Sequence, residues 1–135
     1  MTINVKKRIV LIFTISLAIV FNTMIAVAQE GPLDGKVFIG QYREKHKRSV
    51  KEDELKFLKG EFHSIGYGQR GFNGGAYKAE TVAGKIYFEA ETVSSKQGKI
   101  IWQGIIDGDS IEVNYQWSKK GWLSDTQNDY LFSGT

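Results

Sequence analysis

The sequence predicts an all-β protein, in which eight antiparallel strands form a meander that closes into a small barrel. The stretch from Lys85 to Trp117 alternates apolar and polar residues with a period of two, which is typical of half-buried strands. Short turns containing glycine separate these segments, and no helical periodicity of useful length follows residue 28. Barrel closure would bury the one apolar face and remove both edges. A two-sheet β-sandwich is the alternative that turn spacing leaves open.

The first 28 residues predict a secretory signal peptide. Basic residues open the chain, an apolar run follows over residues 9–21, and Ala26 and Ala28 supply the small residues of a cleavage site. The run is shorter than the ~20 apolar residues that a membrane span needs. We therefore expect cleavage after Ala28 and a secreted or periplasmic protein without a stable membrane anchor. Residues 29–135 are then a single small barrel domain.

Removal of the signal peptide changes the charge balance. The full chain has 18 Lys and Arg against 15 Asp and Glu, and the signal peptide holds three of the bases and none of the acids. The mature chain is therefore neutral, with 15 of each, and it offers no basic footprint for nucleic acid. The chain has no cysteine, so the domain must be held together by its core without disulfides.

Eight segments are predicted as strands from their alternation and from the turns between them. Charged residues 43–53 predict a loop or a brief surface helix, and the glycine-rich residues 66–75 predict a connection. Residues 118–128 predict a longer polar connection, and Pro32 belongs to a short N-terminal lead-in. The predicted strands cover residues 36–42, 54–58, 61–65, 76–82, 85–93, 99–105, 111–117 and 129–133.

Turns that contain glycine set the expected pairing of the strands. Lys59-Gly60 and Ala83-Gly84 each predict a two-residue hairpin turn. A five-residue loop in the region of residues 94–97, and a two- or a four-residue turn around Gly108, both keep the apolar residues on one face. The expected opposite pairs are Phe57 with Phe62, Leu55 with Ser64, Lys78 with Glu89, and Glu91 with Lys99.

The chain contains the stretches LDGKVFIG (residues 33–40), GFNGGAYKAE (71–80) and GKIIWQGIIDGDSIEVNYQWSKKGW (98–122). These stretches resemble small exported bacterial proteins of unassigned function, which are described as calycin-like or lipocalin-like barrels. The resemblance rests on turn glycines and ring positions, so it implies a fold and export. The lipocalin signature Gly-x-Trp is missing, because Gly35-Lys36-Val37 stands there. The group also has a Cys near Ile65 and a Trp near Leu131, and a role of that thiol does not carry over.

Patterns that suggest catalysis or metal binding are weak. Residues 66–71 match G-x-G-x-x-G, but a strand follows where a dinucleotide site needs a helix. Glu89 and Glu91 share an exposed face with lysines expected opposite them, and exposed, paired carboxylates make poor general acids. Neither His46 nor His63 has a second ligand at metal-binding spacing. The sequence therefore predicts no catalytic residue, no metal site, no cofactor and no enzymatic activity.

The strongest functional signal is the excess of aromatic rings on the inward face. An eight-stranded barrel either fills with its own side chains or holds one small ligand. The first hypothesis is a non-enzymatic barrel that binds an apolar or amphipathic small molecule, with Tyr hydroxyls and a Trp N–H as polar anchors. The second is a protein-interaction module, such as an inhibitor or an envelope-assembly factor, with a filled core. The candidate ligand-binding residues are Phe62, Tyr77, Phe88, Trp102, Tyr115 and Trp117.

Overall fold

The computed structural model describes residues 31–135, so the predicted signal peptide lies outside the described residues. The elements are β1 (Val37–Glu44), β2 (Lys51–Leu58), β3 (Glu61–Ser64), α2 (Ile65–Gly68), β4 (Gly75–Val82), β5 (Lys85–Ser94), β6 (Gly98–Asp107), β7 (Ser110–Lys119) and β8 (Thr126–Gly134). Each strand pairs antiparallel with the next, and β8 pairs with β1. The predicted eight-stranded antiparallel barrel is confirmed, and the β-sandwich alternative is wrong.

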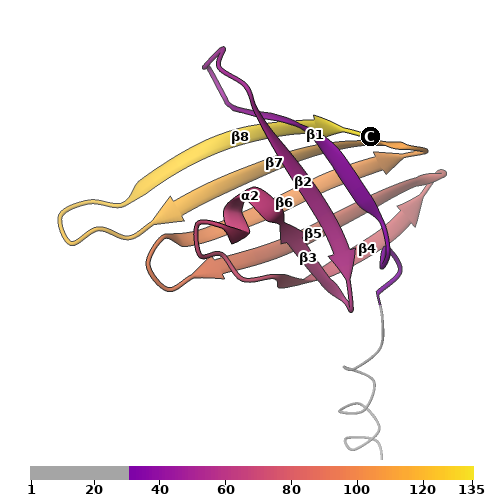
Figure 1. Ribbon diagram of the computed structural model, residues 1–135, viewed down its shortest axis with the longest axis horizontal. Coiled ribbons are helices and arrows are strands. Elements are labelled where there is room, and N and C mark those ends of the chain that lie inside the picture. The colour runs from indigo at the N-terminus through magenta and orange to yellow at the C-terminus, as the bar shows by residue number, and fades with distance from the viewer. Residues whose placement is uncertain (1–30) are drawn as a thin grey trace, which may run out of the picture.

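Figure 1 shows two groups of strands that face each other across the core. The long strands β5 to β8 curve together as one broad sheet, and β1, β2 and β3 cross that sheet steeply. Burial alternates along the long strands: in β6, Ile100 and Trp102 are buried, whereas Ile101 and Ile105 are exposed. This is the period of two that the sequence predicts. No helix within residues 31–135 is long and apolar enough to cross a membrane.

The connections predicted over residues 43–53 and 118–128 are both shorter than expected. β1 runs on to Glu44 and β2 begins at Lys51, so only residues 45–50 form a loop. The prediction of a loop or helix over all of residues 43–53 is therefore wrong at both ends. Charged residues extend the strands because their outward side chains remain in water, while Asp53 on the inward face finds partners inside the protein. In the same way, the connection predicted over residues 118–128 contracts to residues 120–125.

The pairings set by the two-residue turns are confirmed. Phe57 lies opposite Phe62, and Lys78 lies opposite Glu89. The pairing of β5 with β6 is two residues away from the prediction, since Val93 and not Glu91 lies opposite Lys99. The loop holds only residues 95–97, because Gly98 closes it with a φ of 93°. A shift of two residues leaves every side chain on its expected face, so the inward set is unchanged.

Phenylalanine rings fill the half of the core next to the two-residue turns. Gly104 faces inward on β6, and a Cβ there would clash with the Phe88 ring, so glycine makes room for that ring. Three rings surround Phe57 edge-on, with centroids 5.0 to 5.3 Å away: Phe62, Tyr77 and Phe88. Edge-to-face contacts of this kind stabilise a pair of rings by ~0.5–1.5 kcal/mol beyond the effect of the area they bury.

The lead-in, residues 31–36, covers this half of the core. Leu33 is 1% exposed, and its N–H donates to the Tyr77 hydroxyl at 2.8 Å. That hydroxyl donates to Asp34 at 2.8 Å, and Asp34 also accepts the Gly60 N–H. Burial, followed by the hydrogen bond to Asp34, raises the pKa of Tyr77 to about 12. Partial burial opposes ionisation of Asp34, but the hydrogen bonds outweigh it and hold its pKa below the ordinary value of 3.8.

Candidate ligand-binding cleft

The two ends of the barrel are built differently. Because neighbouring strands are antiparallel, successive connections alternate between the ends. The turn end has the two-residue turns 59–60, 83–84 and 108–109, together with the lead-in. The loop end has the longer connections 45–50, 65–74, 95–97 and 120–125.

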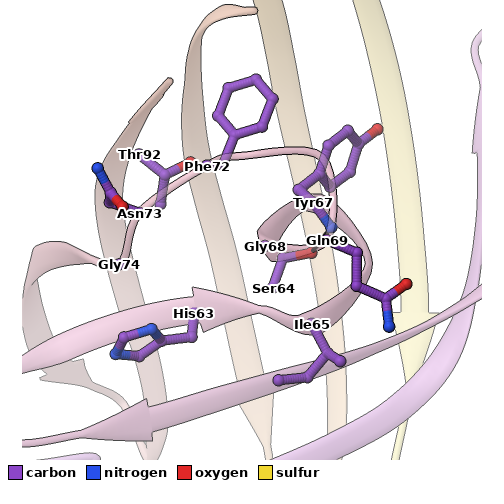
Figure 2. Close-up of a pocket in the computed structure, with 10 residues that line it drawn as sticks. All are labelled: His63, Ser64, Ile65, Tyr67, Gly68, Gln69, Phe72, Asn73, Gly74 and Thr92. Atoms are coloured by element: carbon purple, nitrogen blue, oxygen red, sulfur yellow. Dashed lines mark hydrogen bonds between the residues drawn. The ribbon is translucent and has the colours of Figure 1, made fainter. Parts of the chain in front are cut away.

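A cleft with a volume of about 300 Å³ opens at the loop end, where the chain leaves β3 and returns in β4. Figure 2 shows the segment from His63 to Gly74 curving around this cleft, with Thr92 of β5 behind it. The cleft is amphipathic, because aromatic rings and polar side chains both contribute to its wall. The side chains that line it include Tyr67, Phe72, His63, Gln69, Asn73 and Thr92.

The cleft lies at the seam where the barrel ladder is shortest. β3 and β4 pair only through Glu61 with Ala76 and Phe62 with Gly75, whereas the β5–β6 ladder continues from residue 86 to residue 94 of β5. Beyond Phe62 the two strands diverge, and the 63–74 segment occupies the gap. A Cβ at Gly75 would clash with the carbonyl oxygen of Glu91, so glycine lets the returning chain cross close to β5.

Asp53 of β2 holds this segment in place. Its carboxylate accepts hydrogen bonds from the Ser64 hydroxyl and, at 2.8 Å, from the Gly66 N–H. Ser64 is the N-cap of α2, and its oxygen accepts the Tyr67 N–H at 3.1 Å. Asp53 and Ser64 are both buried, so they take the place of water for the backbone groups at the start of α2.

Tyr67 connects the segment to the core. Its buried ring packs edge-on against Trp102 and Tyr115, with centroids 5.7 Å away in both cases. The hydroxyls of Tyr67 and Tyr115 lie 3.2 Å apart, and burial raises the pKa of both, so both stay neutral. Arg70 covers Tyr67 from outside: its guanidinium lies 4.9 Å from the ring centroid and donates to the Tyr42 hydroxyl at 3.1 Å.

Thr92 links the cleft to the buried tryptophan. The indole Nε1 of Trp102 donates to Thr92 Oγ1 at 2.9 Å, and both side chains are buried. The Trp102 ring also stacks on Tyr115, with centroids 4.3 Å apart. A molecule that enters the cleft and displaces Thr92 would therefore change the surroundings of Trp102.

The polar groups of the cleft suit hydrogen bonding to a guest molecule. His63 Nε2 lies 3.4 Å from Glu61 Oε2, and the His63 ring covers the backbone of Gly74. The Ser64 hydroxyl already donates a hydrogen bond to Asp53.

Within residues 31–135, no group of three or more His, Cys, Asp or Glu side chains is placed to hold a metal ion. Figure 2 shows the Tyr67 and Phe72 rings pointing to the same side of the segment, while Ile65 points the other way.

The structure brings five of the six predicted site residues together and leaves the sixth at the rim. Trp117 is half-buried at the loop end, where its Nε1 donates to the carbonyl oxygen of Gln97 at 2.7 Å. None of the six lines the cleft. Two larger and more open grooves, of about 650 and 520 Å³, lie on the outer face, and of the six only Phe88 reaches one of them. The five buried together are Phe62, Tyr77, Phe88, Trp102 and Tyr115.

The period of two along β5 places Thr92 on the inward face with Phe88 and Ala90. The sequence analysis predicted none of the other parts of the cleft. Asp53 had a signal, because it continues the inward alternation of Leu55 and Phe57. Tyr67 and Phe72 had none, since they lie in a glycine-rich connection without periodicity. The expected plain connection over residues 66–75 contains the last three residues of the one-turn helix α2, and no long helix follows the glycines.

The chain was compared with protein-family models, with curated proteins and with solved structures, and none of them matches it.

Proposed function

We propose that this protein is an exported, non-enzymatic barrel of the calycin-like type, and that it binds a small amphipathic molecule in the cleft beside α2. The observation that carries the proposal is that aromatic rings fill the core, whereas the cleft is open. The inward rings contact one another at centroid distances of 4.3 to 5.3 Å, for example in the Phe57 and Trp102 groups. The cleft, in contrast, presents open volume with polar and aromatic walls.

The size of the cleft sets the class of ligand. Small-molecule sites have volumes of about 300–1,000 Å³, and this cleft is at the lower limit. A compact molecule with one apolar end and one hydrogen-bonding end fits such a volume, and a full-length lipid chain does not. Tyr67 and Phe72 would contact the apolar end, while Gln69 and Asn73 would bind the polar end.

Tryptophan fluorescence and two-dimensional NMR of residues 29–135, titrated with short-chain amphiphiles and small aromatic acids, test this function. Binding should shift the amide signals of residues 63–74 and Thr92, and it should change the Trp102 emission through the Thr92 hydrogen bond. Gly68→Leu places a side chain at a cleft position where a Cβ meets no atom within 4 Å, and it should block binding while the fold remains.

Gln103→Leu on the outer face of β6 is the matched control, because it adds a similar apolar group away from the cleft. It should leave binding unchanged. Titrations in which no signal of the 63–74 segment responds to any member of the panel would contradict the proposal. Equal loss of binding in the Gln103→Leu variant would show that the cleft is not the site.

A second candidate function is supported by the filled core. A barrel packed with its own rings is a rigid scaffold, and its loop end presents connections 45–50 and 120–125 to a protein partner. Pull-down from the native envelope or medium distinguishes the two functions. A partner that is lost on substitution in these loops, but kept in Gly68→Leu, would favour the interaction module.

A further inference from the structure

Two large apolar side chains stand in water at the loop end. Trp122 is 94% exposed and Leu123 is 82% exposed, and the next most exposed large apolar residue described is Ile39 at 63%. Single apolar residues on a surface are normal, but an almost fully exposed indole beside an exposed leucine is not. The other two tryptophans, in contrast, both donate their Nε1 hydrogens to partners within the protein.

The backbone of the 120–125 loop presents this pair outward. A Cβ at Gly121 would clash with the carbonyl oxygen of Ser124, so the chain at these two residues is drawn together and residues 122 and 123 form the bend. Figure 1 shows the loop between β7 and β8 at the left edge of the molecule, beyond the body of the barrel. The two side chains are thus the tip of a projecting loop.

Lysines surround the base of this tip. Lys119 and Lys120 precede it, and they share a groove of about 520 Å³ with Lys96 and Lys99 from the neighbouring hairpin. The pairing of Lys99 with Ser118 holds the two sides of the groove together. The Trp117 Nε1 hydrogen bond to the Gln97 carbonyl is a second link between them.

The groove is positively charged overall. Its carboxylates are Glu91 and Asp125, against four lysines. In the part of the chain that the structure describes, the four salt bridges are formed by other residues, so these lysines remain available to an anionic partner.

We propose that the 120–125 loop, together with Lys119 at the end of β7, docks the barrel on an anionic lipid bilayer. Trp122 and Leu123 would enter the boundary between headgroups and acyl chains, and the lysines would contact lipid phosphates. Indole rings favour this boundary, and basic side chains beside it add attraction to anionic lipid. The contact is peripheral and reversible, because one loop buries little apolar area.

The composition of the patch favours a bilayer over a protein partner. Lysine is depleted at protein–protein interfaces, whereas a bilayer surface accepts a tip that combines Trp, Leu and lysines. The tip is also convex, and a soft interface can close around it without a matching pocket. The ligand cleft lies in a different connection of the loop end, so docking does not depend on the proposed ligand.

Vesicle co-sedimentation tests the proposal directly. We use residues 29–135, because the closed barrel and its core lie within residues 31–135 and the apolar segment 9–21 would bind vesicles by itself. At low salt the protein should sediment with vesicles of phosphatidylglycerol and phosphatidylethanolamine, and much less with phosphatidylcholine alone. Added salt should weaken binding, because it screens the exposed lysines.

Two double variants separate the contributions of the tip. Trp122→Ser with Leu123→Ser should lower the partition coefficient about tenfold or more, because the apolar contact is removed. Lys119→Gln with Lys120→Gln should lower it about tenfold on anionic vesicles, because each lysine near the surface adds attraction. Matched controls elsewhere on the barrel, Ile39→Ser and Lys36→Gln with Lys59→Gln, should leave it unchanged. Thermal unfolding should show that all variants stay folded.

Three results would overturn the proposal. The first is a wild-type protein that does not bind anionic vesicles at low salt. The second is equal loss of binding in the tip variants and the controls, which would indicate charge attraction without a defined surface. The third is a protein partner that depends on Trp122 while vesicle binding is absent, which would assign the tip to a protein interface.

Discussion

The two ends of the barrel differ in how they are closed. At the turn end the connections are two residues long, the lead-in covers the core, and phenylalanine rings pack edge-on beneath it. At the loop end the connections are longer, and the buried polar side chains Asp53, Ser64, Thr92 and Ser94 lie there. Within residues 31–135 every buried side-chain nitrogen and oxygen has a hydrogen-bond partner. The buried polar side chains of the loop end are therefore fully hydrogen-bonded.

This difference explains why the cleft and the projecting loop share one end. A two-residue turn cannot curve around a ligand, because the pairing of its two strands fixes its backbone geometry. A longer connection can curve away from the barrel and enclose volume, provided that its backbone groups find partners. At the start of the 63–74 segment, Asp53 accepts the Gly66 N–H and Ser64 accepts the Tyr67 N–H. The turn end is therefore expected to provide stability, and the loop end to provide binding.

The largest expected effect is at the turn end. Phe57→Ala removes the ring that Phe62, Tyr77 and Phe88 surround, and it should lower the free energy of unfolding by about 3–5 kcal/mol. Denaturant unfolding measures this loss. Leu58→Ala, at the next residue on the same strand and 52% exposed, should cost under about 1 kcal/mol. Similar losses in both variants would contradict the assignment of stability to this core.

A smaller effect, confined to the loop end, is expected from Asp53→Ala. The variant leaves the Ser64 hydroxyl and the Gly66 N–H without their acceptor, which should cost about 2–3 kcal/mol. Hydrogen exchange should rise in residues 63–74 and not in the turn-end strands. Glu52→Ala, one residue earlier and facing outward, should change little. Uniform exchange across the barrel would show that the ends are not separate in stability.

The smallest effect is a pH dependence at the turn end. The folded pKa of Asp34 lies below the unfolded value of 3.8, so its carboxylate stabilises the fold above that pH and the contribution disappears as pH falls through the folded pKa. Asp34→Asn should therefore be less stable than wild type near neutral pH, and the difference should shrink in acid. Unfolding midpoints between neutral and acid pH measure this. A constant difference would rule out linkage to Asp34.

Local patterns were sufficient to predict the barrel and the registers of two of its hairpins. Alternation along β5, β6 and β7 identifies the inward set, and the turns at Gly60 and Gly84 set the registers of their hairpins. The β5–β6 pairing was wrong by two residues, because alternation repeats every two residues and cannot choose between registers that differ by that amount. The φ of 93° at Gly98, which shortens the loop, is a property of the folded hairpin.

The amino-acid sequence by itself determined most of the strands and their faces, because alternation and turns depend on neighbours along the chain. It also fixed the equal numbers of acidic and basic residues in residues 29–135. Only the tertiary structure decided that Tyr67 joins the buried rings while Trp122 remains in water. Both residues lie in glycine-containing connections without periodicity. A ring in such a connection is buried where side chains from distant strands meet it, and Trp102 and Tyr115 meet Tyr67 in this way.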